Sequence, residues 1–438
     1  EIRDGLGRVA KRVDGNRNAV TMLYDTVASD GLVETAQSDA LAHVTKVRSD
    51  GAGRARTAID ALGFIATAAF DANGNRVESR DANTVGMTCT FDARNRDGVC
   101  TTTRSDVPTT TSRTYDAHNN VLTETDALGK VTVCTYDARD RKTTSTDRIN
   151  AMTTFRYDLV SNLTRIIDAE GNELVPGAGI TDYTYDGRNL LRTEAFPTGS
   201  VGRTVRTYTY DGGKRLTSRR VTTNPVSSFS ELTRYVYDRA NRLRTRAYAD
   251  GNNDRFGYDL ASRLTSAITA RYGITVNRFF DVGGRLTSER QAFTNGSVSG
   301  TTVSAQASTV SYQYDADNRT TRITYPNGTF VTRGYTARDQ LASVEYDGAS
   351  VASRTYDNGG RLSQTTYGNA IVENRTYVPG AQMVEAIAST PTSFTYSYDA
   401  NGRKLTETDT ISAANSQTFN YDNQDRLTSW SKVGGVTP

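Results

Sequence analysis

The chain is built from short segments rich in Thr, Val and Tyr that are separated by clusters of Asp, Gly and Asn. β-Branched and aromatic residues favour strands, whereas Asp, Gly and Asn favour turns. We find no stretch with the sustained 3.6-residue spacing of apolar residues that marks an amphipathic helix. The pattern therefore predicts an all-β fold with almost no helix.

The turns recur with a base period of 21 residues, and every departure from this period is an insertion. Four weaker anchors (Asp4, Asp50, Tyr335 and Tyr377) complete an array of about 19 units over residues 1–438, with longer insertion loops near 170–182, 222–232 and 293–310. A repeat of this length indicates stacked supersecondary units that stabilise one another. The aromatic–Asp anchors begin at Tyr24, Phe70, Phe91, Tyr115, Tyr136, Tyr157, Tyr185, Tyr210, Tyr237, Tyr258, Phe280, Tyr314, Tyr356, Tyr398 and Tyr421.

Each anchor Asp is predicted to open a hairpin tip. With this Asp as position zero, position +3 is Gly, Asn or Asp in 14 units, and these residues tolerate a positive φ. Position +4 is Arg in 12 of the 19 units, so we expect the Asp and the Arg to face each other across a three-residue loop with a bulge. The candidate tip residues are Asp238, Arg242, Asp281, Gly284, Arg285, Asp357, Gly360, Arg361, Asp399, Gly402 and Arg403.

The same register determines which side chains lie on each face of the sheet. The aromatic at −1 lies opposite position +5, which is often Leu, so Tyr–Leu pairs are expected on one face and Asp–Arg pairs on the other. A second turn follows ten residues after several anchors, as at Asp14 and Asp60. Nineteen units of two strands predict roughly 38 antiparallel strands. So long a sheet must twist, and we expect it to coil into a spiral that covers its own edges.

The three cysteines are predicted to be free thiols. Cys89 is at −3 and Cys100 at +8 of the unit anchored by Asp92. A regular ladder beyond a three-residue loop pairs −3 with +7, so Cys100 would lie on the opposite face from Cys89. Cys134 lies two units further along, beyond disulfide reach.

Charge and motifs argue against several kinds of function. The 52 basic and 49 acidic residues nearly balance, and each Arg at +4 is expected to face an Asp across its hairpin, so nucleic acid is not an expected partner. No apolar run is long enough for a membrane span. The chain contains no P-loop or dinucleotide-binding motif, and it has only two His. Loops such as Asp71–Asn75 resemble calcium loops, but turn chemistry explains them. We therefore expect no catalytic, cofactor-binding or metal site.

The units Phe280–Leu286 and Tyr356–Leu362, both of the form aromatic-Asp-x-x-Gly-Arg-Leu, resemble the YD-repeat (Rhs) family. This family includes bacterial Rhs toxins, toxin-complex shells and teneurin barrels, and the resemblance covers essentially the whole chain. It implies a β-sheet that spirals into a hollow shell, secreted or at the cell surface. The family's shells are usually closed by a self-cleaving segment with an Asp-Pro motif. This sequence has no Asp-Pro dipeptide, so we expect no plug, protease or toxin domain within it.

The leading expectation is a non-enzymatic shell wall that encapsulates or displays a polypeptide. Its partners would be a polypeptide cargo or the remaining parts of a longer chain. One alternative is a cell-surface adhesin or carbohydrate-binding protein, with aromatic rows and insertion loops as contacts for surface glycans. Another is an extracellular structural filament formed by self-association of the repeats.

Overall fold

The computed structural model describes residues 1–107, 109–169, 179–199, 202–224, 230–293, 296–298, 301–303 and 306–433. These residues form strands joined by tight turns, together with one 3-10 turn, η1 (Ala413–Asn415). The predicted all-β class is confirmed. Within the described ranges, no helix has the length and apolar character needed to cross a membrane.

The strands are short, most of them of five or six residues. The first twenty are β1 (Ile2–Arg3), β2 (Val9–Val13), β3 (Ala19–Val27), β4 (Val33–Ser38), β5 (Val44–Ser49), β6 (Ala55–Ile59), β7 (Ile65–Phe70), β8 (Arg76–Arg80), β9 (Gly86–Phe91), β10 (Asp97–Thr102), β11 (Thr110–Tyr115), β12 (Val121–Thr125), β13 (Val131–Tyr136), β14 (Lys142–Thr146), β15 (Met152–Tyr157), β16 (Leu163–Ile167), β17 (Ile180–Tyr185), β18 (Leu191–Gly199), β19 (Gly202–Tyr210) and β20 (Leu216–Asn224). The others are β21 (Ser230–Tyr237), β22 (Leu243–Ala247), β23 (Asn253–Tyr258), β24 (Leu264–Thr269), β25 (Ile274–Phe280), β26 (Leu286–Phe293), β27 (Gly296–Val298), β28 (Thr301–Val303), β29 (Gln306–Tyr314), β30 (Thr320–Thr324), β31 (Phe330–Tyr335), β32 (Leu341–Tyr346), β33 (Ala349–Tyr356), β34 (Leu362–Tyr367), β35 (Val372–Tyr377), β36 (Val384–Ala388), β37 (Ser393–Tyr398), β38 (Lys404–Asp409), β39 (Gln417–Tyr421) and β40 (Leu427–Lys432).

Thirty-eight of these strands form one sheet, in agreement with the predicted number. Each strand pairs antiparallel with the next one in the chain, and β26 pairs with β29 because β27 and β28 form a separate hairpin. Anchor tips lie along one edge of this ribbon and the second turns along the other. Asp25 is an exception, because it lies within β3 and the chain turns at residues 28–32 instead.

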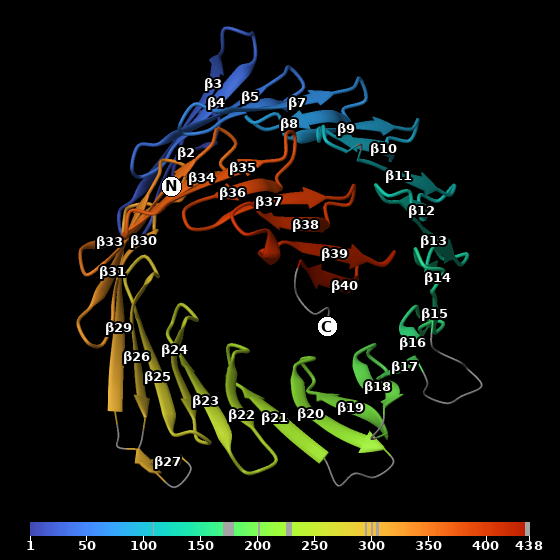
Figure 1. The fold of residues 1–438 in the computed structure, drawn as a ribbon. Coiled ribbons are helices and arrows are strands. Elements are labelled where there is room, and N and C mark those ends of the chain that lie inside the picture. Colours follow the sequence, from blue (N-terminus) through green and yellow to red (C-terminus); the bar gives the residue numbers. More distant parts are fainter. Residues whose placement is uncertain are drawn as a thin grey trace.

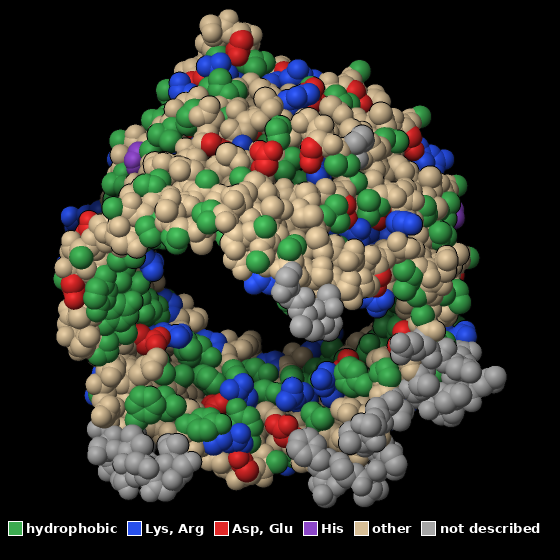
Figure 2. All heavy atoms as spheres, viewed as in Figure 1, with side chains coloured by type: hydrophobic (Ala, Val, Ile, Leu, Met, Phe, Trp, Pro, Cys, Tyr) green, Lys and Arg blue, Asp and Glu red, His purple; other side chains and the backbone are tan. Residues whose placement is uncertain are grey.

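The ribbon coils so that its last part lies beside its first part (Figure 1). Strands β25–β26 and β29–β40 lie next to strands β2–β15, edge to edge, and strands β16–β24 complete the ring. In the space-filling view the ring encloses an opening, with hydrophobic and Lys or Arg side chains on the inner surface near β21–β25 (Figure 2). The wall is therefore one sheet thick around a hollow.

The expected insertions fall where strands lengthen. The described part of 222–232 belongs to β20 and β21, and that of 293–310 to the ends of β26 and β29 and to the β27–β28 hairpin. Residues 170–178 of the first expected loop lie outside the described residues.

The prediction of three free cysteines is wrong, because Cys89 and Cys100 form a disulfide and Cys134 is free and buried. Phe91 pairs with Asp97, as expected for −1 and +5, but the register then shifts and Cys89 pairs with Cys100. The same shift follows the other anchor tips that flank it, as where Tyr115 pairs with Val121 but Thr114 pairs with Thr123. A bulge at +6 adds one residue to the second strand, which places −3 opposite +8.

We expect one reactive thiol per chain when cysteines are counted in denaturant without a reducing agent. Reduction should lower the free energy of unfolding by about 2–4 kcal/mol, because the bridge closes a loop in the unfolded chain. A Cys89→Ser/Cys100→Ser variant should behave like the reduced protein. A count of three thiols in the unreduced protein would contradict the bulged register.

Few side chains are fully buried in this thin wall. Ile167, Ile180 and Val378 are among the small set of buried apolar residues, whereas many large apolar side chains are half-exposed. A single sheet has no second layer to pack against, so contacts between successive units must supply much of its stability.

Candidate functional site

Each anchor tip is organised by its Asp carboxylate. In the tip at Asp281, Oδ1 accepts a hydrogen bond from the Arg285 backbone N–H (2.9 Å) and Oδ2 accepts one from Arg285 Nε (2.7 Å). The tip at Asp357 repeats this geometry with Arg361, at 2.8 and 2.7 Å. The carboxylate therefore holds both the turn backbone and the Arg side chain.

The other candidate tips have the same arrangement. Nε of Arg242 lies 2.8 Å from Oδ2 of Asp238, and Nε of Arg403 lies 2.5 Å from Oδ2 of Asp399. The glycines at +3 have φ values of +90° (Gly284), +87° (Gly360) and +81° (Gly402). These left-handed conformations favour Gly, which explains its recurrence at this position. The structure brings all eleven candidate residues into four such tips.

The Arg side chain also reaches the next unit. Nη1 of Arg285 donates to the carbonyl of Asp315 (3.0 Å), and its guanidinium lies 4.9 Å from the centre of the Tyr314 ring. The prediction that Arg and the aromatic residues occupy opposite faces is therefore wrong. Arg leaves the turn at the ribbon edge, where the pleat no longer separates the faces, and stacks on the next anchor aromatic. The same stacking occurs at Arg8, Arg54, Arg96, Arg141, Arg215, Arg242, Arg263, Arg319, Arg361 and Arg403.

The anchor tyrosine makes a second link between units. The hydroxyl of Tyr356 donates to the carbonyl of Leu341, at +5 of the preceding unit (2.8 Å), and Tyr377 donates likewise to Leu362 (2.9 Å). Burial raises the pKa of Tyr377 above its ordinary value of 10.0, so its hydroxyl stays a donor further into the alkaline range. Sequence reasoning missed this bond, although the recurrence of Tyr at −1 together with an apolar residue at +5 of the preceding unit was its signal. It explains why Tyr outnumbers Phe among the anchors.

The tips are strongest while their carboxylates are ionised. A hydrogen bond from the Arg96 side chain is the main cause that lowers the pKa of Asp92 to about 2, and Arg141 does the same for Asp137. Because the folded value lies below the ordinary 3.8, this stabilisation is present above about pH 4 and is lost as the pH falls toward 2.

We expect Asp137→Asn to lower the urea midpoint of unfolding at about pH 6 and to have little effect at about pH 2, where wild type has lost the same interaction. Urea unfolding at about pH 6, 4 and 2 measures this convergence. If the urea midpoint of Asp137→Asn were lower than that of wild type by the same amount at all three pH values, the carboxylate charge would not stabilise the tip.

The edges of successive coils meet along a line that we name the coil seam. One edge supplies second turns from the first coil, and the other supplies anchor tips from the next coil. The seam turns begin at Asp14, Asp39, Asp60, Asp81, Thr103, Asp126 and Asp147, and the seam tips facing them begin at Asp281, Asp315, Thr336, Asp357, Val378, Asp399 and Asp422.

The offset between seam partners is constant. The Asp14 turn joins β2 to β3 and meets the tip joining β25 to β26, a step of 23 strands (25 − 2). The Asp147 turn joins β14 to β15 and meets the tip joining β39 to β40, again 23 strands once β27 and β28 are left out (39 − 14 − 2). One coil therefore contains 23 strands along the whole seam.

Amide side chains cross the seam to anchor carboxylates. Nδ2 of Asn83 donates to Oδ1 of Asp357 (2.9 Å), and Nδ2 of Asn16 donates to Oδ2 of Asp281 (3.2 Å). Burial raises the pKa of Asp357, but hydrogen bonds from Asn83 and Arg361 outweigh it and leave the pKa lowered. The carboxylate that shapes the tip thus also binds the neighbouring coil.

Glycines allow the two coils to approach closely. A Cβ added to Gly359 would lie 2.1 Å from Nδ2 of Asn83, and one added to Gly283 would lie 2.1 Å from Nδ2 of Asn16. At Gly380 a Cβ would lie 1.9 Å from the backbone oxygen of Thr103. The Thr103 backbone excludes any side chain at Gly380, whereas a side chain at Gly283 or Gly359 would displace the end of the Asn side chain that crosses the seam.

Arg104 is the most buried guanidinium along the seam among the described residues that form ion pairs, with 3% of its side chain exposed. It is held by Asp106, with Nη2 2.8 Å from Oδ2, and it donates to the carbonyls of Asp399 (2.5 Å) and Tyr398 (3.1 Å) in the next coil. Sequence reasoning missed Arg104, because it lies outside the repeat positions.

Comparison with known proteins supports the fold at two levels. The RHS Repeat family model matches residues 115–148, and no curated protein matches the sequence. Among solved structures, a TcdB2-TccC3-Cdc42 structure has a TM-score of 0.52 at 15% identity and covers 98% of this chain and 23% of its own. A Photorhabdus luminescens Tc holotoxin pore has a TM-score of 0.52 at 14% identity, with 94% and 24% covered.

A third structure, TcdB2-TccC3 without its hypervariable C-terminal region, has a TM-score of 0.52 at 14% identity over 98% of this chain and 23% of its own. The chain thus spans about a quarter of the length of the structures it matches. The resemblance to the YD-repeat (Rhs) family is confirmed: the chain contains an RHS repeat at residues 115–148, and its spiral sheet has the fold of the TcdB2-TccC3 structures.

Proposed function

We propose that this chain is a non-enzymatic section of a shell wall that encloses a polypeptide. The observation that carries the proposal is the coil seam, where one continuous sheet binds its own opposite edge around a hollow (Figures 1 and 2). A ribbon that only displayed its faces would not need seven turn–tip contacts between its edges. Sealing an interior from solvent is the role that needs them.

The other components named in the similar structures support a polypeptide as the enclosed cargo. They include TcdB2-TccC3 with Cdc42 and TcdB2-TccC3 without its hypervariable C-terminal region. By this analogy the chain would form part of a secreted or cell-surface protein and would enclose another segment of the same polypeptide. The chemistry of its tips agrees with a structural role, because the Asp and Arg side chains there bind each other and the turn backbone.

The proposal is tested with the whole chain carrying a flexible test polypeptide after Pro438. If the wall encloses the test polypeptide, an added protease should cleave it at least about tenfold more slowly than the same polypeptide alone. Gly380→Val, which should open the seam, is expected to restore fast cleavage. Equal cleavage rates for the attached and the free polypeptide would refute encapsulation.

A second candidate function rests on one cavity. A hollow of about 330 Å³ lies beside Tyr248, Phe256 and Tyr272, with Arg246 and Asp254 as polar lining. Aromatic linings with a few polar groups are typical of small-ligand pockets, and a glycan is the ligand class proposed for this one. If the chain binds glycans on an array and Tyr272→Ala abolishes this binding, the result would favour this function. If the chain binds none of them, the function is excluded for the glycans displayed.

A further inference from the structure

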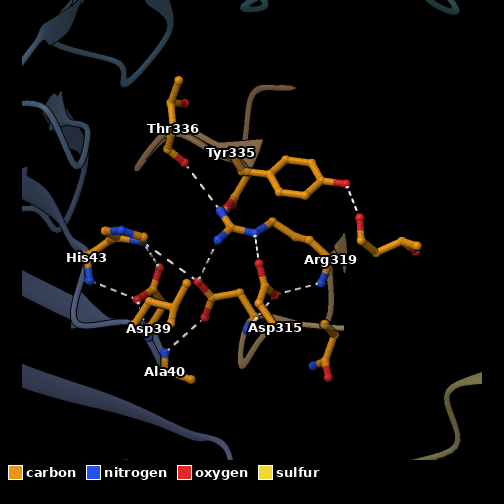
Figure 3. A network of polar contacts seen from close by, with 12 residues as sticks. Asp39, Ala40, His43, Asp315, Arg319, Tyr335 and Thr336 are labelled. Atoms are coloured by element: carbon orange, nitrogen blue, oxygen red, sulfur yellow. Dashed lines mark hydrogen bonds and ion pairs between the residues drawn. The ribbon is translucent and has the colours of Figure 1, made fainter. Parts of the chain in front are cut away.

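Three potential metal ligands meet at one point of the coil seam. Asp39 and His43 lie in the turn between β4 and β5, and Asp317 lies in the tip between β29 and β30. His43 Nδ1 is 2.9 Å from Oδ2 of Asp39 and 3.7 Å from Oδ2 of Asp317. Figure 3 shows His43 and Asp39 facing the tip that carries Asp315 and Arg319. The two coils thus contribute to one cluster although Ala40 and Asp317 are 277 residues apart in the chain.

One oxygen in this cluster is buried without a hydrogen bond. The Asp317 side chain is only 10% exposed, and its Oδ1 accepts a hydrogen bond from the Ala40 backbone N–H (3.1 Å). Its Oδ2 is inaccessible to solvent and has no hydrogen-bond partner. A carboxylate oxygen buried in this way is costly unless a cation or a proton faces it.

The neighbouring guanidinium does not fill this role. Arg319 Nη2 lies 3.8 Å from Oδ2 of Asp317, because its Nε binds Asp315 (2.7 Å) and its Nη1 binds Asp339 (2.6 Å). Asp39 adds a further carboxylate beside Asp317, so the acidic groups at this point outnumber the basic ones. The site therefore has an excess of negative charge that a bound cation would compensate.

We propose that Asp39, His43 and Asp317 bind a divalent transition metal of the zinc type, which joins successive coils. In a tetrahedral site with bonds of about 2.0–2.1 Å, ligand atoms lie about 3.3 Å apart. The observed separations of 2.9 and 3.7 Å bracket this value, and all three ligand atoms lie within 4.8 Å of one another. Calcium prefers six to eight oxygen ligands, so the imidazole selects against it.

The surroundings already orient the ligands. Oδ1 of Asp39 accepts hydrogen bonds from the backbone N–H groups of Leu41 (2.9 Å) and His43 (2.8 Å), which leaves its Oδ2 turned toward His43. Ala40 fixes Asp317 in the same way. Such outer contacts hold metal ligands in place. On binding, Nδ1 of His43 loses any proton to solvent, and both carboxylates bind in the ionised form, so metal affinity should fall as the pH decreases.

Isothermal titration of the whole chain, freed of metal with EDTA, with Zn²⁺ is the direct test. We expect a site at the seam that Asp317→Asn and His43→Gln each weaken at least about a hundredfold, since even outer-shell changes at metal sites cost about 10–100-fold. X-ray absorption at the zinc edge should show one nitrogen and two or three oxygens at about 2.0–2.1 Å. Zn²⁺ should also raise the thermal midpoint of wild type but not of these variants.

The exposed cluster of Asp116, His118 and Asp140 provides a matched control, because it has the same residue types on a single coil. His118→Gln should leave the seam site intact. The alternative occupant is a proton held between Asp39 and Asp317. No zinc binding, or binding that survives both Asp317→Asn and His43→Gln in variants with wild-type circular dichroism, would overturn the metal proposal in favour of that proton. The outcome does not depend on what the wall encloses.

Discussion

Replacing Gly380 by valine is expected to open the coil seam and to lower the free energy of unfolding by about 2–5 kcal/mol. Gly380 has a φ of +71°, which costs a β-branched residue about 1–2 kcal/mol. Its new Cβ would lie 1.9 Å from the oxygen and 2.5 Å from the carbon of the Thr103 carbonyl. Both atoms belong to backbone, so relief requires the tip to leave the seam, and overpacking of this kind adds about 1–3 kcal/mol.

Urea unfolding measures the loss, and small-angle X-ray scattering should show a larger particle as the last strands separate from the first coil. Gly328→Val is the matched control, because Gly328 has a similar φ of +87° but nothing lies within 4 Å of the position that its Cβ would take. Gly328→Val should lower the free energy of unfolding only by the contribution of its positive φ, and it should keep the wild-type scattering profile. Equal effects of the two variants would mean that Gly380 matters only through its backbone conformation.

Arg104→Ala is expected to destabilise the protein by about 1–3 kcal/mol, because part-buried carbonyls lose their donor, whereas the Asp106 side chain is 38% exposed and water can solvate its carboxylate. The change leaves the carboxylate of Asp106 without its guanidinium and removes the donors of the Asp399 and Tyr398 carbonyls. Since those carbonyls belong to the other coil, protease sites in β37–β40 should become accessible before the rest of the wall unfolds. Urea unfolding and limited proteolysis followed by mass spectrometry measure the two effects.

Arg426→Ala is the control for this second prediction. Nε of Arg426 is 2.7 Å from Oδ2 of Asp422, but 66% of its side chain is exposed. Exposed pairs of this kind contribute about 0–1 kcal/mol. If Arg104→Ala were as mild as Arg426→Ala, the buried guanidinium would not be a determinant of the seam.

The features that could be predicted from the sequence are local ones. A turn needs only an Asp to accept backbone N–H groups and a residue that tolerates positive φ, so the period of Asp281, Gly284 and their equivalents predicts the tips. The number of strands follows from the two turns in each unit. The antiparallel order follows as well, because short turns can join only neighbouring strands.

The errors arose where one added residue changes the register. The bulge at +6 puts Cys100 opposite Cys89, while the aromatic–Leu pair at −1 and +5 keeps its expected register. No residue type marks this bulge in the sequence. The seam could not be predicted for a different reason: the offset between coils depends on the summed twist of many strands. Partners such as Asn83 and Asp357 are 274 residues apart and share no local pattern.

The constant step of 23 strands makes the wall comparable to a screw thread. The step is odd because second turns follow even-numbered strands and anchor tips follow odd-numbered strands, and the two opposite edges of the ribbon meet with turns facing tips. If the circumference stays at 23 strands, gain or loss of one whole repeat between the two sides of the seam moves every later tip to a new partner. Asn83 would then face a tip other than that of Asp357, and Gly380 would no longer meet Thr103. Repeats added after the last strand leave all existing partners in place. The wall can therefore lengthen along its axis without changing existing seam contacts, whereas its circumference cannot change without changing them.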